Sequence, residues 1–256
     1  MCYDDNARPP IPPGASGTAH GEDIVLTAAD GNRFAAYIAR AGNPTGAQIV
    51  VFPDVRGLHQ FYKELALRFA EMGIDALAID YFGRTAGLSS RDDSFDFWPH
   101  VQQLKLETFF TDVTAANAYL HSAAGSARPT FVVGFCMGGS LTLLSSTQDF
   151  GWAGAIPFYA GLSRALWGDK TALDMADQVK YPVLGLFGGA DQNIPTDQVH
   201  DLDQKLDKAG VEHEIVIYPG APHSFFDRRA TEFAEASADA WQRVLSFVRA
   251  HTPKGN

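Results

Sequence analysis

One cysteine of this sequence has the surroundings of a catalytic nucleophile. Cys136 lies in GFCMGG, after the apolar segment PTFVV and before a small-residue segment typical of a helix. A strand, a sharp turn and a helix in this order hold the central side chain at the edge of a sheet, where a substrate can reach it. The strained turn leaves room only for glycine two residues before and after the nucleophile, and Gly134 and Gly138 occupy those positions. The alternative is that Cys136 is a small buried core residue, the commonest fate of a free cysteine.

The same turn would also stabilise negative charge. The backbone N–H of Met137 would face the pocket from the N-terminus of the following helix. Such a donor stabilises an oxyanion, and a helix N-terminus lowers the cost of forming a thiolate. We therefore expect Met137 to supply one oxyanion-hole donor and Cys136 to attack a carbonyl carbon.

An aspartate and a histidine stand where they would complete a catalytic triad. Asp191 follows the strand-like segment PVLGLFG, and His223 follows EIVIYP. Nucleophile, acid and base in this chain order form a recurrent arrangement, in which the acid fixes the imidazole tautomer and the imidazole moves protons. The alternatives are that Asp191 only makes a turn and that His223 is a surface or capping residue. The other seven histidines lie in the tail, on helices or in connections that no strand precedes.

Alternating strand-like and helix-like segments would bring these residues together. The turn-like sequence around Asp30-Gly31-Asn32 predicts an antiparallel hairpin of residues 22–28 and 33–40. Further strands are predicted at 48–53, 75–80, 129–135, 154–159, 182–188 and 214–219, and helices at 61–73, 106–123, 140–146, 196–210 and 231–251. This alternation predicts the α/β class, with a mostly parallel sheet and helices on both faces. The segment 82–100 has no period and predicts a long loop.

Composition limits the function classes. Thirty acidic and twenty basic residues give a net charge of −10, which disfavours nucleic-acid and membrane-surface partners. No apolar run is long enough to span a membrane, and the first residues lack the pattern of a signal peptide. Cys2 and Cys136 are too few for a disulfide framework or a cysteine zinc site. These features predict a cytoplasmic protein whose cysteines are not bonded to each other.

One folded unit is expected. Residues 1–19 are rich in Pro, Gly and small polar residues and predict a tail that is disordered or lies along the surface. No Gly/Ser linker divides residues 20–256, which we expect to form a single domain.

Three motifs together resemble the dienelactone hydrolase family, the carboxymethylenebutenolidase-like branch of the α/β-hydrolases. GFCMGG, GGADQNIP and YPGAPHSFF occur in the family's order, and the resemblance extends from about Glu22 to the last predicted helix. It implies an α/β-hydrolase fold, hydrolysis of small unsaturated lactones in the breakdown of aromatic compounds, and no metal or cofactor. A small-molecule lactone or ester is the implied partner, and a homodimer is compatible with it.

The resemblance also implies a residue that activates the thiol. Family members carry an acidic residue after the third strand, and the matching stretch here is PDVRG, with Asp54 in place of the family's Glu. Its side chain is one methylene shorter, so reach and activation would differ. The backbone N–H of Val55 would resemble the second oxyanion donor. The alternative is that Asp54 is an ordinary turn carboxylate.

Arginines that could bind a substrate carboxylate do not follow the family pattern. The family's position shortly after the histidine holds Asp227 here, with Arg228 one residue later. Arg56, Arg84 and Arg91 are further candidates, since guanidinium groups suit carboxylates. Trp98 and Phe225 are aromatic candidates for the pocket mouth, together with Phe82, Phe95 and Phe226, although ordinary core packing is the better explanation for most of them.

The sequence therefore predicts a cysteine-dependent hydrolase that cleaves a small enol-lactone or ester through a thioester. Two alternatives stay open. One is a broad-specificity hydrolase of small esters or thioesters. The other is a catalytically silent protein of this fold that binds or senses a ligand, which the substitutions at Asp54 and Asp227 would favour.

Overall fold

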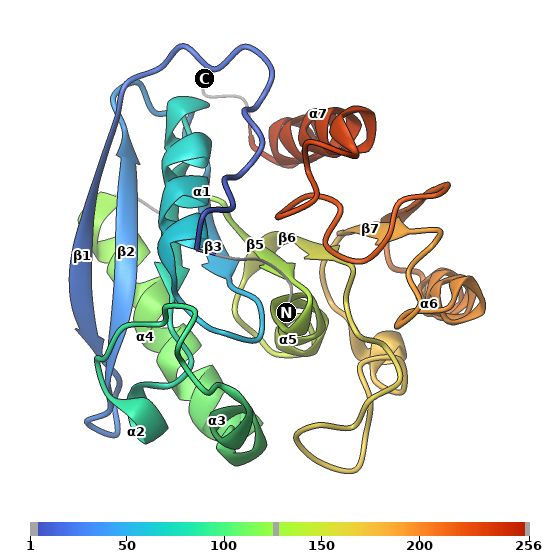
Figure 1. Cartoon of the computed structure of the whole chain (residues 1–256), viewed down its shortest axis with the longest axis horizontal. Coiled ribbons are helices and arrows are strands. Elements are labelled where there is room, and N and C mark those ends of the chain that lie inside the picture. Colours follow the sequence, from blue (N-terminus) through green and yellow to red (C-terminus); the bar gives the residue numbers. More distant parts are fainter. Residues whose placement is uncertain (1–4, 125–127, 254–256) are drawn as a thin grey trace.

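A single eight-stranded sheet organises the protein (Figure 1). The computed structural model describes residues 5–124 and 128–253. The strands lie in the order β1-β2-β4-β3-β5-β6-β7-β8. Their bounds are β1 Ala19–Thr27, β2 Arg33–Ala41, β3 Gln48–Phe52, β4 Asp75–Ile79, β5 Thr130–Phe135, β6 Trp152–Phe158, β7 Val183–Gly188 and β8 His213–Tyr218. Strand β2 pairs antiparallel with β1 and β4, and all other pairs are parallel. The predicted hairpin and the mostly parallel α/β sheet are confirmed.

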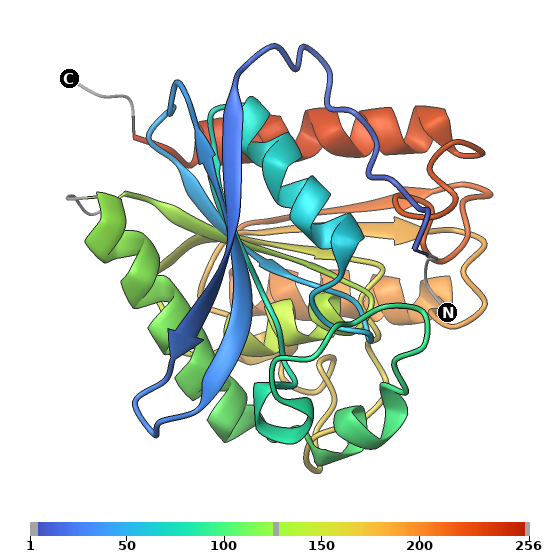
Figure 2. The ribbon, with the colours of Figure 1, turned by 60° about the vertical axis from the view of Figure 1, so that its left-hand side comes forward.

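Helices cover both faces of the sheet. Figure 2 shows α1 and α7 on one face and α4, α5 and α6 on the other. Their bounds are α1 Gln60–Glu71, α4 Leu106–Ala124, α5 Met137–Ser145, α6 Thr196–Ala209 and α7 Ala234–Ala250. The central strands β3, β4 and β5 are buried along their whole length, as their unbroken apolar sequences predict. Among the described residues, no helix is both long and apolar enough to cross a membrane.

Two segments differ from the sequence prediction or refine it. The predicted loop 82–100 contains two short helices, α2 Gly83–Ala86 and the start of α3 Trp98–Gln103. Residues 5–18 of the predicted tail lie along the surface, where the indole of Trp241 donates to the carbonyl of Pro10 at 2.9 Å. Cys2 lies outside the described residues.

Glycines allow α5 to start directly against the ends of β3 and β5. A Cβ atom on Gly138 would lie 2.2 Å from the carbonyl oxygens of Phe52 and Pro53. A Cβ atom on Gly134 would lie 2.1 Å from the carbonyl oxygen of Gly138. These neighbours are backbone atoms that no side-chain rotation can move. The two glycines therefore set how closely the helix approaches the sheet at the residue between β5 and α5.

Replacing Gly138 should separate the helix from the sheet. We expect Gly138→Ala to lower the free energy of unfolding by about 1–3 kcal/mol or more, because the added methyl group overpacks a rigid backbone contact. Urea unfolding monitored by circular dichroism measures this. Gly161→Ala is the matched control, because its Cβ would approach only the Ser140 hydroxyl, at 3.3 Å. Equal stability of the two variants would contradict the role given to Gly138.

Candidate active site

Cys136 occupies a strained turn between β5 and α5. Its φ of 55° and ψ of −114° lie outside the regions that residues other than glycine normally adopt. The backbone N–H of Cys136 donates to the carbonyl of Phe158 at 3.1 Å, and its own carbonyl accepts from Ser140 at 3.2 Å. These bonds tie the turn to β6 and to the first turn of α5. The half-buried side chain of Cys136 lines a cavity, so the interpretation as a sealed core residue does not hold.

Asp191 and His223 meet through a short hydrogen bond. Asp191 lies just past β7 and His223 just past β8, and Nδ1 of the imidazole is 2.6 Å from Oδ2 of the carboxylate. The other carboxylate oxygen accepts the backbone N–H of Asn193 at 2.8 Å. The Asp191 side chain is 1% exposed and that of His223 is 19% exposed. Because a buried carboxylate accepts the hydrogen bond at Nδ1, the orientation of the ring is fixed. The other ring nitrogen, Nε2, is then available for proton transfer on the side of the cavity.

A second contact supports the histidine loop. The Tyr159 ring centroid lies 5.0 Å from that of His223, and its hydroxyl is 3.1 Å from a carboxylate oxygen of Asp227. Asp227 is buried, and its other oxygen accepts the backbone N–H of Arg228. Asp227 thus holds the loop that carries His223. Tyr159 itself has a positive φ of 34°, so this strand end is strained as well.

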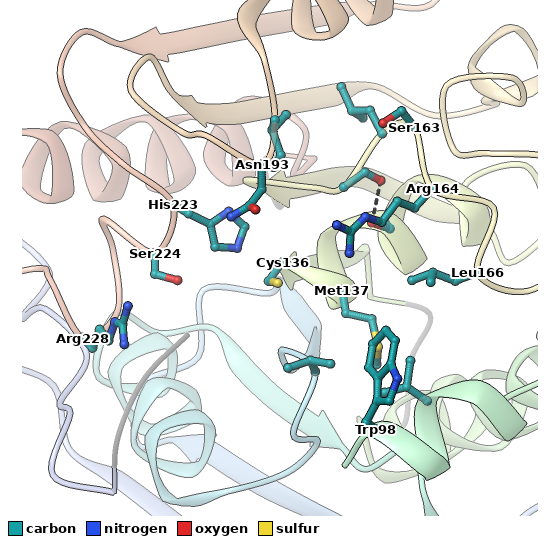
Figure 3. A pocket seen from close by; sticks show the side chains of 16 residues that line it. Trp98, Cys136, Met137, Ser163, Arg164, Leu166, Asn193, His223, Ser224 and Arg228 are labelled. Atoms are coloured by element: carbon teal, nitrogen blue, oxygen red, sulfur yellow. Dashed lines mark hydrogen bonds between the residues drawn. The ribbon is translucent and has the colours of Figure 1, made fainter. Parts of the chain in front are cut away.

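The cavity is small and mostly apolar. It has a volume of about 340 Å³, near the lower end for small-molecule sites. Figure 3 shows Cys136 at its centre, with His223 on one side and Trp98, Met137 and Leu166 on the other. The described lining residues are Val55, Trp98, Val101, Cys136, Met137, Ser140, Gly161, Leu162, Ser163, Arg164, Leu166, Asn193, Ile194, His223, Ser224 and Arg228.

The two expected oxyanion donors lie at this cavity. Met137 is the first residue of α5, so its backbone N–H has no acceptor within the helix. Val55 lines the cavity from the loop after β3. This loop is held by Tyr81, whose hydroxyl donates to the carbonyl of Pro53 at 2.5 Å. Burial raises the pKa of Tyr81 well above its usual value, so the phenol stays neutral and keeps donating.

Asp54 is fully buried next to Val55, which lines the cavity. One carboxylate oxygen accepts the backbone N–H of Arg56 at 2.9 Å and lies 3.5 Å from Nε2 of His59. The other carboxylate oxygen has no hydrogen-bond partner among the described residues. Burial lowers the pKa of His59, which favours a neutral imidazole beside the carboxylate. Asp54 thus makes the turn contact expected of a loop carboxylate, and one of its oxygens is left for a further proton or donor.

The structure corrects the assignment of three arginines as substrate-binding candidates, because they bind carboxylates of the chain itself. Arg56 is buried and binds the carboxylates of Asp5 and Asp93. The other two arginines lie in the segment after β4. Arg84 pairs with Asp30 at 2.6 Å and with Asp112 at 2.7 Å, and Arg91 forms a buried pair with Asp80 at 2.9 Å. The carboxylate partners of the three arginines lie 11 to 54 residues away in the sequence, so the local pattern did not reveal them. All three stabilise loops around the site and lie outside its cavity.

The remaining substrate-binding candidates divide between the cavity and the core. Trp98 and Arg228 line the cavity. Phe225 is fully buried and packs against Tyr159 and Tyr218, so its assignment to the pocket mouth is wrong. Tight packing behind the histidine loop explains its position.

Several cavity residues were not selected from the sequence. They include Ser140, Arg164, Leu166, Asn193 and Ser224. Tyr159, whose ring packs against His223, was not selected either. Tyr159 follows β6 immediately, so the rule that strand ends carry the chemistry would have identified it. Arg164 lies in an aperiodic segment and carries no such signal. Within residues 5–124 and 128–253, no group of three His, Cys, Asp or Glu side chains is placed to hold a metal ion.

Comparison with known proteins agrees with this architecture. The model of the dienelactone hydrolase family matches residues 34–252. A Yersinia pestis protein provisionally named carboxymethylenebutenolidase is 27% identical over 86% of this chain and 85% of its own length. A Methylorubrum extorquens protein with the same provisional name is 31% identical over 78% of this chain and 71% of its own.

Solved structures give the same result. A crystal structure from Klebsiella pneumoniae, provisionally described as a dienelactone hydrolase, has a TM-score of 0.79 and 27% identity, covering 91% of this chain and 99% of that one. The family match spans most of the chain, and the strand order and the turn at Cys136 are those of an α/β-hydrolase. The chain therefore belongs to the dienelactone hydrolase family, a family of hydrolases.

Proposed function

We propose that this protein hydrolyses small enol-lactones or activated esters through a thioester on Cys136. The observation that carries the proposal is the shared cavity of Cys136 and the His223–Asp191 pair, which are joined to three different strand ends. The names of its relatives add support, because carboxymethylenebutenolidases open an enol-lactone ring.

The first half of the reaction forms the thioester. The Cys136 thiol gives its proton to Asp54 or His223, and the thiolate attacks the substrate carbonyl carbon. Backbone N–H groups of Met137 and Val55 bind the resulting oxyanion. The tetrahedral intermediate collapses by breaking the bond between the carbonyl carbon and the ring or ester oxygen. That oxygen leaves as an enolate or alkoxide and takes up the proton that Asp54 or His223 accepted from the thiol, which gives a neutral enol or alcohol group.

The second half releases the acid. His223 removes a proton from water, and the hydroxide attacks the thioester carbon. The carbon–sulfur bond breaks, Cys136 leaves as the thiolate, and the acid is released. Asp191 stabilises the imidazolium that forms at this step and keeps the ring in one orientation. For an enol-lactone the overall reaction consumes one water and gives a keto acid after the enol tautomerises.

Loss of the nucleophile, or of the carboxylate that orients the histidine, should strongly reduce turnover. We expect Cys136→Ala to lower kcat for p-nitrophenyl acetate by at least about 10³-fold, and Asp191→Asn by about 10²- to 10⁴-fold, because the imidazole loses its oriented tautomer. Steady-state kinetics measure both values. Asp203→Asn serves as a matched control, because Asp203 pairs with His213 away from the cavity. Full activity of a folded Cys136→Ala protein would exclude the thioester mechanism.

The role of Asp54 can be separated from that of a turn residue. If Asp54 accepts the thiol proton, Asp54→Asn should raise the pH at which iodoacetamide alkylates Cys136 half-maximally, because a nearby base is removed. The alkylation rate is measured as a function of pH by mass spectrometry. Thermal unfolding checks that the buried isosteric change leaves the fold intact. An unchanged profile together with unchanged kcat would assign Asp54 a structural role alone.

Leaving-group dependence distinguishes the lactonase from a general esterase. A thiolate nucleophile favours leaving groups that are stable as anions, so kcat/KM for an enol-lactone and for p-nitrophenyl acetate should exceed that for ethyl acetate by more than about tenfold. A substrate panel under one set of conditions measures this. An enol-lactone preferred over the aryl ester supports the lactonase, and the reverse order supports a broad small-ester hydrolase. Absence of turnover on all three would favour the silent binding or sensing protein.

A further inference from the structure

Arg56 places a buried positive charge directly beside Val55, the residue expected to supply the second oxyanion donor. Its side chain is 2% exposed, and its guanidinium binds two carboxylates, that of Asp5 at 2.7 Å and that of Asp93. The carbonyl of Arg91 accepts a further N–H of this group at 3.1 Å. Burial of a charged group costs free energy unless the charge is paired and hydrogen-bonded. The position of Arg56 is therefore determined by the carboxylates around it.

Arg56 and Val55 are the two central residues of a tight turn. The backbone N–H of Gly57 donates to the carbonyl of Asp54 at 3.1 Å and closes this turn. The backbone N–H of Arg56 donates to the Asp54 carboxylate at 2.9 Å. Val55 and Cys136 line the same cavity. Because one planar peptide group joins Val55 to Arg56, a shift of Arg56 also moves Val55 and its N–H group.

One of the two carboxylates comes from the N-terminal segment, which follows a fixed path along α1. Figure 1 shows the segment before β1 running between α1 and α7. Arg8 pairs with Glu64 of α1 at 3.3 Å, and the indole of Trp241 in α7 donates to the carbonyl of Pro10 at 2.9 Å. Four prolines within residues 9–13 restrict the unfolded chain and so reduce the entropy lost when this segment becomes ordered. Anchors on two helices therefore hold the carboxylate of this segment in place.

Asp5 and Asp93 fix each other as well as the guanidinium. The backbone N–H of Asp5 donates to the Asp93 carboxylate at 3.2 Å, and the backbone N–H of Asp93 donates to the Asp5 carboxylate at 3.0 Å. The bond from the Asp93 backbone, together with the bond from Arg56, holds the pKa of Asp5 below its usual value, so this carboxylate is charged at neutral pH. The segment after β4 and the N-terminal segment therefore bind Arg56 as one unit.

We propose that Asp5 is a positioning residue of this hydrolase: through Arg56 it fixes the turn whose Val55 N–H binds the oxyanion, so the N-terminal segment takes part in building the oxyanion hole. The inference rests on the proposed function, because that function makes Val55 an oxyanion donor. Such a donor must point at the place where charge develops, and a misplacement of about 1 Å can slow a reaction about 10²-fold. Without the Asp5 carboxylate, Arg56 retains Asp93, so we expect the turn to loosen without unfolding.

The test separates the oxyanion turn from the thiol. At saturating p-nitrophenyl acetate, Asp5→Asn should lower the rate constant for acylation of Cys136 by about 10- to 100-fold, because the tetrahedral intermediate loses an oriented donor. Alkylation of Cys136 by iodoacetamide, at a pH at which the thiol is ionised, should keep the wild-type rate, because displacement at a saturated carbon forms no oxyanion. Stopped-flow release of p-nitrophenolate and mass spectrometry measure the two rates. Asp5→Glu keeps the charge and should recover most of the acylation rate.

Asp30→Asn is the matched control, because Asp30 makes the same kind of contact outside the cavity. The side chains of Asp30 and Asp5 are 41% and 42% exposed, and they lie 2.6 and 2.7 Å from arginines that each bind a second carboxylate. Asp30→Asn should therefore acylate at the wild-type rate. Wild-type acylation in Asp5→Asn, an equal loss in both variants, or a loss of alkylation equal to the loss of acylation would each overturn the proposal.

Hydrogen exchange tests the contact without any turnover. The amide protons of Arg56 and Gly57 are both bonded to Asp54, so their exchange depends on the integrity of the turn. NMR at residue resolution should show faster exchange of both protons in Asp5→Asn than in the wild-type and Asp30→Asn proteins. Unchanged exchange would overturn the proposal, whatever the kinetics. Faster exchange in a protein whose wild type forms no acyl-enzyme would refute the proposed function, and the oxyanion role with it, while confirming that Asp5 holds the turn.

Discussion

The close approach of α5 to the ends of β3 and β5 is the constraint on which the site depends. Gly134 and Gly138 permit it, and the residue between them has to adopt a positive φ to connect strand and helix. Cys136 is the residue of this turn that adopts the strained backbone conformation. Its side chain is thereby turned into the cavity. Met137, the first residue of α5, lines the same cavity, and its backbone N–H has no acceptor within the helix. The positions of the Cys136 side chain and of this N–H group therefore follow from one packing contact.

The imidazole of His223 is also held in a fixed position, in this case by contacts with other side chains. Asp191 fixes Nδ1 of His223 from the end of β7, while Tyr159 packs against the ring and binds Asp227 on the same loop. The resemblance to the family implies an arginine at the position that Asp227 occupies in this chain. In the structure, Asp227 supports the loop that carries His223. Arg164 and Arg228, by contrast, line the cavity.

The sequence predicts those features of the structure that depend on residues close to one another in the chain. Strands β3, β4 and β5, the hairpin and the order of Cys136, Asp191 and His223 are predictable, because apolar periodicity and glycine spacing are local signals. The functions of Arg84 and Arg91 are not, because their carboxylate partners lie 11 to 54 residues away in the sequence and meet them only in the folded chain. Phe225 shows the same limit, since an aromatic residue after a catalytic histidine can face either the pocket or the core. Helix α3 was not predicted, because its six residues are too few to show a helical period in the sequence.

The proposed hydrolysis depends on a covalent thioester on Cys136, and trapping this intermediate is a direct test. The protein is mixed with p-nitrophenyl acetate, quenched in acid within the first turnover, and digested for mass spectrometry, with His223→Asn studied in parallel to slow hydrolysis of the thioester. We expect one acetyl group per chain, located on Cys136, that accumulates further in His223→Asn. Hydrolysis that proceeds with an acyl group on another residue, or with none on Cys136 in either protein, would contradict it.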